Sequence, residues 1–276
     1  MTDKPILIVG GTGKTGRRVA GRLWDRGIGV RIGSRSATPA FDWEKPAGWP
    51  AALEGVASAY ITYYPDLSMR GAPESVGAFA RLAVASGVTR LVLLSGRGEP
   101  EAQRSEEVLD ASGADWTVLR CSWFAQNFSE GMLLDALLAG EVALPVGDVR
   151  EPFVDADDIA DAAVAALTAP GHSGKLYELT GPRLLTFAEA VAEIARASGR
   201  EMRCVQIPVA DFAAALAGYG LPADQEAMIV ELFTEVLDGR NQFVSNGVEQ
   251  ALGRRPRDFS DYVRDTAASG VWNVAR

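Results

Sequence analysis

A glycine-rich turn near the amino terminus is the strongest chemical signal in this sequence. Gly10-Gly11-Thr12-Gly13-Lys14-Thr15-Gly16 follows the apolar run Ile6 to Val9 and opens a helical pattern that extends to Asp25. The glycines fit two spacings, G-x-x-G-x-x-G from Gly10 and G-x-G-x-x-G from Gly11. Both allow a tight turn, close approach of the backbone to a pyrophosphate, and close packing of helix on strand. The N–H groups of the new helix then face the anion. We therefore expect the whole turn to bind a dinucleotide, through Gly10, Gly11, Thr12, Gly13, Lys14, Thr15 and Gly16.

A triphosphate-binding loop is the alternative for this turn, because Gly13-Lys14-Thr15 ends like one. That motif needs a glycine five residues before Gly13, and Ile8 stands there, within the predicted strand. The turn is therefore too short to wrap a triphosphate.

The segment after the second predicted strand indicates which dinucleotide is bound. An NAD site places Asp or Glu there to hold the ribose 2′-hydroxyl. Here the strand that ends at Ile32 continues as Gly33-Ser34-Arg35-Ser36, without a carboxylate. Ser34 can hydrogen-bond, Arg35 can pair with a 2′-phosphate, and Lys14 can add charge, which favours NADP over NAD. A solvated loop cation is the alternative for Arg35.

Composition and charge exclude several classes of protein. The chain has 276 residues, of which 47% are hydrophobic and 23% charged, an ordinary globular balance. Its net charge of −9 argues against nucleic acid binding across a whole face. Cys121 and Cys204 have neither metal-ligand nor disulfide spacing, and the single histidine, His172, cannot build a zinc site. We therefore expect no metal.

The sequence also gives expectations about location and partners. No apolar run approaches the roughly 20 residues that span a bilayer. Met1 to Lys4 leads into the first strand without the long apolar stretch and cleavage site of a signal peptide. We expect a chain that begins at or near Met1 in the cytoplasm, acts on a small molecule, and binds no nucleic acid or membrane. No feature indicates the oligomeric state.

Short apolar runs alternate with helical periods through the first half of the chain. This rhythm predicts an α/β fold, a doubly wound parallel Rossmann sheet with helices on both faces. The strands are expected at 6–9, 30–32, 40–43, 57–64, 90–95 and 116–120. The rhythm changes after residue 121. We therefore expect an NADP-binding Rossmann domain over 1–121 and a smaller C-terminal α/β lobe, mainly for substrate, over 122–276, with some segments returning to the Rossmann domain.

The second half has its own predicted elements. Helices are expected over 124–138 and 155–167, and strands over 175–179 and 202–208. Thr186 and Glu189 have the spacing of a capping box, which places a helix start between them.

Several side chains follow predicted strands, at the edge of the sheet where ligands bind. We expect contacts with the cofactor from Asp42, Thr62, Tyr63, Tyr64 and Ser95. For Asp42, the alternative is a turn before Trp43. Aromatic side chains could sandwich a flat substrate. The expected substrate contacts follow the sixth strand and are Ser122, Trp123, Phe124, Asn127 and Phe128. Packing within the lobe is the alternative for its aromatic residues, and also for the possible far-wall residues Phe212, Met228 and Phe233.

A family resemblance is carried by short stretches that run in order along nearly the whole chain. They are Gly10 to Gly16, Arg35, Phe41-Asp42-Trp43, Leu53 to Val56, Val118-Leu119-Arg120, Phe153-Val154-Asp155, Asp158-Ile159-Ala160 and Tyr177 to Pro182. In them the chain resembles the NmrA-like branch of the atypical short-chain dehydrogenase/reductase superfamily. Within that branch it is similar to bacterial relatives of the ergot-alkaloid iminium reductases. The resemblance implies a Rossmann fold, NADP(H), and a substrate cleft beside a small C-terminal lobe.

The chain departs from typical short-chain dehydrogenases in its acid–base residues. Those enzymes use a Tyr-x-x-x-Lys pair, but no tyrosine occurs between Tyr64 and Tyr177 and no lysine between Lys45 and Lys175. Arg104 falls where isoflavone-reductase-like relatives hold their lysine. An arginine is a poor general acid. We expect Arg104 either to hold the nicotinamide ribose or a substrate oxyanion, or to be a solvated helix residue.

The missing pair favours acceptors that need little help from an acid. Iminium ions, quinones and conjugated enones accept hydride more readily than ketones do, so orientation and a dry pocket can suffice. The sequence therefore predicts an NADPH-dependent reductase of a small electron-poor molecule. The alternative is a non-catalytic protein that senses the NADP(H) state.

Overall fold

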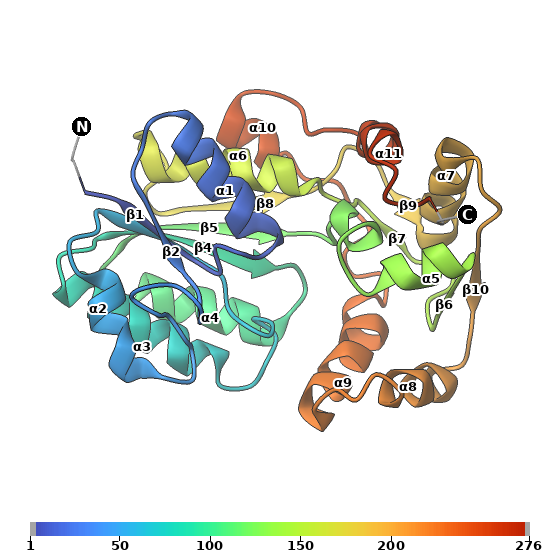
Figure 1. Cartoon of the computed structure of the whole chain (residues 1–276), viewed down its shortest axis with the longest axis horizontal. Helices are drawn as coiled ribbons and strands as arrows, with labels where there is room; N and C mark the ends of the chain where they lie inside the picture. The colour runs from blue at the N-terminus through green and yellow to red at the C-terminus, as the bar shows by residue number, and fades with distance from the viewer. Residues whose placement is uncertain (1–3, 274–276) are drawn as a thin grey trace. The chain divides into compact units, whose positions relative to one another are not determined.

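A parallel sheet of six strands forms the centre of the first of two compact units (Figure 1). The computed structural model describes residues 4–273, so the expected start at Met1 lies outside the described residues. Across the sheet the order is β2 (Val30–Gly33), β1 (Ile6–Val9), β3 (Ser58–Ile61), β4 (Arg90–Gly96), β5 (Asp115–Cys121) and β8 (Lys175–Leu179). Every neighbouring pair is parallel. Because β2 and β3 lie on opposite sides of β1, the sheet is doubly wound, which confirms the predicted fold class.

Helices cover both faces of this sheet (Figure 1). One face carries α1 (Lys14–Asp25), α6 (Ala156–Thr168) and α10 (Gly247–Leu252). The other carries α2 (Trp49–Leu53), α3 (Ala72–Ala85) and α4 (Pro100–Asp110), with the short 3-10 turn η1 (Pro46–Gly48) before α2. Coverage on both sides explains why Leu91, Val92 and Leu93 are all fully buried although their side chains alternate in direction. None of the helices within residues 4–273 is long and apolar enough to cross a membrane.

The described residues divide into two compact units, which are described separately. The first unit contains the sheet. It consists of three stretches of chain: the described residues up to Cys121, Ala156–Leu179 and Asn246–Arg254. The second unit consists of Ser122–Asp155, Thr180–Ser245 and the described residues from Arg255 onward.

The second unit is a smaller α/β assembly. Strand β6 (Glu141–Leu144) pairs in parallel with β10 (Arg203–Gln206), and β7 (Arg150–Glu151) pairs antiparallel with β9 (Leu185–Thr186). Its helical segments are η2 (Ala125–Phe128), α5 (Leu133–Ala139), α7 (Phe187–Ser198), α8 (Val209–Ala217), α9 (Ala223–Glu231), the π-helical η3 (Leu232–Val236) and α11 (Phe259–Ala268). Edge-on contacts between aromatic rings, such as Phe153 against Phe187 at 5.2 Å, form its core.

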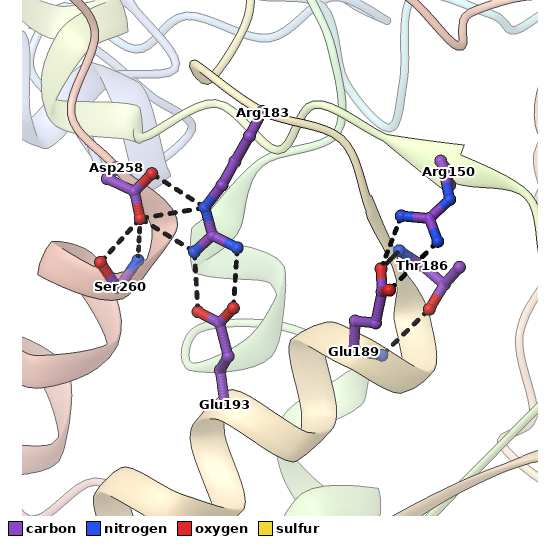
Figure 2. Close-up of polar contacts among 7 residues, drawn as sticks. All are labelled: Arg150, Arg183, Thr186, Glu189, Glu193, Asp258 and Ser260. Atoms are coloured by element: carbon purple, nitrogen blue, oxygen red, sulfur yellow. Dashed lines mark hydrogen bonds and ion pairs between the residues drawn. The ribbon is translucent and has the colours of Figure 1, made fainter.

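Two groups of polar contacts hold helices of the second unit in place, one at the start of α7 and one around Arg183 (Figure 2). The predicted capping box is confirmed at the start of α7, where Glu189 N donates to Thr186 Oγ1 at 3.0 Å and Thr186 N donates to Glu189 Oε2 at 2.9 Å. Arg183 lies between two carboxylates, donating to Glu193 of α7 at 2.7 Å and to Asp258, the N-cap of α11, at 2.9 Å. Arg183 therefore ties α7 to the start of α11.

Two sequence predictions are wrong. Residues 40–43 do not form a strand. Phe41 and Trp43 instead bury their rings against Phe79, at 5.5 Å each, so aromatic packing rather than strand pairing accounts for the apolar pattern. The helix expected over 124–138 is divided, because η2 ends at Phe128 and α5 begins at Leu133. Gly131 lies in the gap, where it weakens a continuous helix.

Candidate cofactor and substrate site

The glycine turn connects β1 to α1 and has the backbone shape that the sequence implied. Gly10 has a left-handed φ of +71°, and a β-carbon there would lie 2.0 Å from Thr62 Oγ1. Gly13 N donates to Gly10 O at 2.9 Å and closes the turn. Only glycine meets both demands at residue 10, because other residues rarely adopt this φ and would collide with Thr62.

Gly16 sets how closely α1 approaches the turn. A β-carbon at residue 16 would lie 2.2 Å from Gly10 O and 2.8 Å from Gly11 Cα. At Gly11 a β-carbon would lie 2.9 Å from Ile32 Cδ1 of β2, so glycine at this position allows the turn to pack closely on the neighbouring strand. The spacing G-x-x-G-x-x-G, from Gly10 through Gly13 to Gly16, therefore describes the turn itself.

The first turn of α1 offers its backbone N–H groups to an anion. The N-cap is Gly13, which is exposed and has no side chain to accept from these groups. Thr12 is also exposed and Lys14 is half-buried, whereas Thr15 is 4% exposed beneath the turn. A phosphate at this helix end would meet backbone donors and the positive end of the helix dipole.

The ends of β2 and β3 meet in a contact between two predicted cofactor residues. The Arg35 guanidinium lies over the Tyr64 ring at 5.0 Å, a cation–π distance, and Tyr64 is 60% exposed. Ser34 precedes Arg35, and its carbonyl oxygen accepts from Phe41 N at 2.9 Å. This hydrogen bond closes the loop over residues 34–41, which carries Ser34 and Arg35.

Thr62 and Tyr63 have structural partners at the end of β3. Thr62 Oγ1 donates to Val9 O at 3.1 Å, so this hydroxyl ties the end of β3 to the end of β1. Trp43 Nε1 donates to Thr62 O at 3.0 Å, and the Trp43 ring lies 5.0 Å from the half-buried Tyr63 ring. These contacts shape the edge of the sheet directly beside the glycine turn.

Asp42 has the geometry of a turn residue. Its Oδ1 accepts from Glu44 N at 3.1 Å, and its Oδ2 lies 3.2 Å from Lys45 Nζ. The hydrogen bond from the Glu44 backbone, with help from Lys45, lowers the pKa of Asp42. These contacts match the turn before Trp43 that the sequence left open for this residue.

Ser95 turns toward a partly buried ion pair that the sequence did not predict. Its hydroxyl donates to Glu106 Oε1 at 2.5 Å, and Arg120 Nε donates to the same oxygen at 3.0 Å. Glu106 is 7% exposed, and Arg120 also lies 3.4 Å from Glu178. The proton of the Ser95 hydroxyl is therefore directed toward Glu106. The sequence signal for this network is a charged residue, Arg120, directly after the apolar Val118-Leu119.

Arg104 lies on the outer surface of α4. Its side chain is 55% exposed, lies 3.0 Å from Glu101 Oε1 and reaches within 3.7 Å of Glu74 on α3. These are the contacts of a solvated helix residue.

A second residue that the sequence analysis missed, Glu99, follows β4. It is half-buried, and its carboxyl group lies where a side chain at Gly96 would otherwise be, since a β-carbon there would be 2.1 Å from Glu99 Oε1. Its only sequence signal is a polar loop, Gly96 to Pro100, directly after a buried strand.

The predicted substrate residues belong to the second unit and differ in exposure. Trp123 is half-buried, with its ring 4.8 Å from that of Phe233 and 5.7 Å from that of Phe187. Ser122 is buried and donates through Oγ to Pro152 O at 2.6 Å. Phe128 is fully buried in the core of the unit, whereas Phe124 and Asn127 are half-buried.

The residues that the sequence offered for the far wall of the substrate pocket also differ in exposure. Phe212 and Phe233 lie in the aromatic core of the second unit, 5.1 Å apart, whereas Met228 is half-buried on α9. The described residues contain no cluster of His, Cys, Asp and Glu that could hold a metal ion.

Comparison with known proteins relates this arrangement to characterised reductases. No family model matches the chain. It is 32% identical to agroclavine dehydrogenase of Claviceps fusiformis, covering 97% of this chain and 98% of that protein. It is 30% identical to NAD(P)H azoreductase of Xenophilus azovorans, covering 96% and 98%.

A solved structure shares the fold. The NADPH-dependent quinone oxidoreductase of Escherichia coli, determined with NADPH, superposes with a TM-score of 0.78 at 23% identity, over 94% of this chain and 99% of that one. With the glycine turn, the doubly wound sheet and relatives matched over almost their whole length, this chain belongs to the NmrA-like branch of the atypical short-chain dehydrogenase/reductase superfamily.

Proposed function

We propose that this chain is an NADP(H)-dependent oxidoreductase that transfers hydride to a small, electron-poor organic acceptor. The observation that carries the proposal is the turn between β1 and α1, in which Gly10 and Gly16 leave no room for side chains and Gly13 exposes the start of the helix. The names of the two curated relatives, a dehydrogenase and an NAD(P)H azoreductase, support the same class of reaction.

The first unit has the residues to hold such a cofactor. The N–H groups at the start of α1 suit the pyrophosphate, and Arg35 with Ser34 suits a 2′-phosphate at the end of β2. The stacking of Arg35 on Tyr64 preorganises the guanidinium at that position. The bound cofactor supplies the hydride, and the protein supplies binding, orientation and exclusion of water.

The acceptor class follows from the missing Tyr-x-x-x-Lys pair. We infer an iminium ion, a quinone or a conjugated enone, because the reduction of each can proceed without a Tyr–Lys pair as the proton donor. The proposed substrate contacts in the second unit are Ser122, Trp123, Phe124 and Asn127. Phe128 supports them from the core.

The test is consumption of NADPH by the purified chain with a panel of cationic dyes, quinones and enones, followed through the absorbance of the reduced nicotinamide. We expect turnover with at least one acceptor class and a preference for NADPH over NADH. A chain that binds NADP and NADPH with clearly different affinities, yet reduces none of the panel, would be a sensor of the cofactor's redox state instead.

A further inference from the structure

We propose that Glu99 is a catalytic residue of this reductase, whose carboxyl group gives a proton to the oxygen of a quinone or conjugated-enone acceptor. The inference rests on the proposed function. It concerns the quinone and enone acceptors of that function, whose oxygen takes up a proton when hydride arrives.

Glu99 lies where a reacting acceptor is expected in a doubly wound sheet. Ligands of such sheets bind outside the carboxyl ends of the strands, at the point where the strand order reverses. Here that point lies between β1 and β3, and β4 follows next in the sheet. The Glu99 carboxyl group packs on Gly96, the last residue of β4, at this same edge.

Glycine at residue 96 makes this placement possible. A β-carbon there would lie 2.1 Å from Glu99 Oε1 and 2.2 Å from Glu99 Oε2, so any larger residue would displace the whole carboxyl group. Glu99 is also the N-cap residue of α4, but its side chain makes no capping hydrogen bond. The carboxyl group is therefore held at the strand end rather than used to start the helix.

The surroundings of Glu99 favour its protonated form. Burial is the main cause, and negative charge on Asp66, after β3, and on Glu106, of α4, adds to it, so the pKa of Glu99 lies well above its ordinary value. Cys121, at the end of β5, faces it as a thiol whose pKa is also raised by burial. Arg97 lies two residues before Glu99 on the same loop, and Arg120 of β5 is engaged by Glu106.

The proposed step balances in atoms and electrons. A bound NADPH would supply a hydride, which would form a C–H bond at the electron-poor carbon of the acceptor, and the electron pair of the conjugated system would move to the carbonyl oxygen. The Glu99 O–H bond breaks as its proton joins that oxygen, which leaves a carboxylate and an enol. Tautomerisation of the enol then gives the saturated ketone or, from a quinone, the hydroquinone, without further change in oxidation state. Water then returns a proton to Glu99. A cationic dye needs no such step, because hydride alone neutralises it.

The test compares the two acceptor classes in the variant Glu99→Gln, which keeps the shape of the side chain but has no acidic proton. With a naphthoquinone, we expect kcat to fall by roughly 100-fold or more, the usual scale of a general acid. With a triphenylmethane dye cation, we expect a change of less than about 3-fold, well below that scale. NADPH affinity, measured by calorimetry, should be unchanged. Glu107→Gln, on the exposed side of the same helix, is the matched control and should change neither rate.

The pH dependence provides a second test. For the quinone, kcat/KM of the unaltered chain should fall as pH rises through the pKa of Glu99. Asp66→Asn removes a nearby negative charge, so this fall should begin at lower pH. Infrared difference spectra should show a protonated-carboxyl C=O band at neutral pH that is absent in Glu99→Gln.

The outcomes separate the two proposals. If the unaltered chain reduces no acceptor, the proposed function itself is wrong, and with it the role of Glu99. If the chain is active but Glu99→Gln lowers both acceptor rates equally, or lowers neither, Glu99 is not the proton donor and the reductase proposal stands. A carboxylate at neutral pH in the infrared spectra would also overturn the role of Glu99.

Discussion

Gly16 packs directly on the carbonyl group of Gly10, so that a β-carbon at residue 16 would lie 2.2 Å from that oxygen. Gly16→Ala must therefore push α1 away from the turn and misalign its first N–H groups. We expect NADPH affinity to fall by at least about 10-fold, the loss of roughly one charged hydrogen bond. Isothermal titration calorimetry measures this directly.

Gly21 provides the matched control on the same helix. A β-carbon there would meet nothing within 4 Å. Gly21→Ala should leave NADPH affinity unchanged and raise the free energy of unfolding by about 0.5–1 kcal/mol, because alanine is the better helix former. Equal losses of affinity in both variants would refute a specific role for the Gly16 contact.

Arg35 is expected to set the cofactor preference. Arg35→Asp removes the cation from the end of β2 and places a carboxylate near a 2′-phosphate. We expect NADPH affinity to fall by roughly 10- to 100-fold while NADH affinity changes little, since NADH has no 2′-phosphate. Arg26→Asp, an equal charge change at the exposed end of α1, is the control. A matching loss of NADH affinity in Arg35→Asp would contradict the assignment.

The sequence predicted the parts of the fold that depend on local pattern. Buried strands, the glycine turn and the capping box at Thr186 each have a signature within a few residues, and the structure contains them. Residues 40–43 were misassigned because Phe41 and Trp43 pack on Phe79, a residue far away in the sequence. The order of apolar Phe41, polar Asp42 and apolar Trp43 resembles the alternation of a half-buried strand.

The candidate site also combines features set by local sequence with features set by contacts between distant segments. The glycine turn could be predicted because all of its glycines lie within seven consecutive residues, so their spacing alone indicates its backbone shape. Glu99 could not, because its surroundings come from separate segments, with Asp66 after β3, Glu106 on α4 and Cys121 on β5. Whether a carboxyl group is buried beside other carboxylates depends on strand order, which residue spacing alone does not specify.

Arg183 is expected to link stability to acid pH. Its hydrogen bonds lower the pKa of Asp258, so Asp258 favours the folded state above its ordinary pKa, and this contribution is lost as pH falls through the lowered value. Arg183→Met should lower the free energy of unfolding at neutral pH by about 1 kcal/mol, since both groups are partly exposed. It should also move acid unfolding to higher pH.

Circular dichroism during acid titration measures that shift. Arg240→Met is the control, because Arg240 pairs with Asp238 only two residues away in the chain. It should leave the acid transition where it is. An unchanged transition in Arg183→Met would show that the link between α7 and α11 contributes nothing to stability.

Phe128 is expected to act through stability rather than substrate contact. It is fully buried, with its ring 5.3 Å from that of Phe153, and its carbonyl oxygen accepts from Trp272 Nε1 at 2.8 Å. Phe128→Ala should lower the free energy of unfolding by about 3–5 kcal/mol, measured by urea denaturation. Trp123→Phe, at a half-buried position, should cost much less. A small loss for Phe128→Ala would place residue 128 outside the core.

The sheet-bearing unit is assembled from three separated stretches of chain. Helix α6 and strand β8 come from Ala156–Leu179, and α10 comes from Asn246–Arg254. A ribosome that has made only the stretch ending at Cys121 has therefore made five of the six parallel strands, with α1 alone on one face and β5 at an open edge. The helical cover of this sheet is therefore complete only once the stretch that ends at Arg254 has also been made.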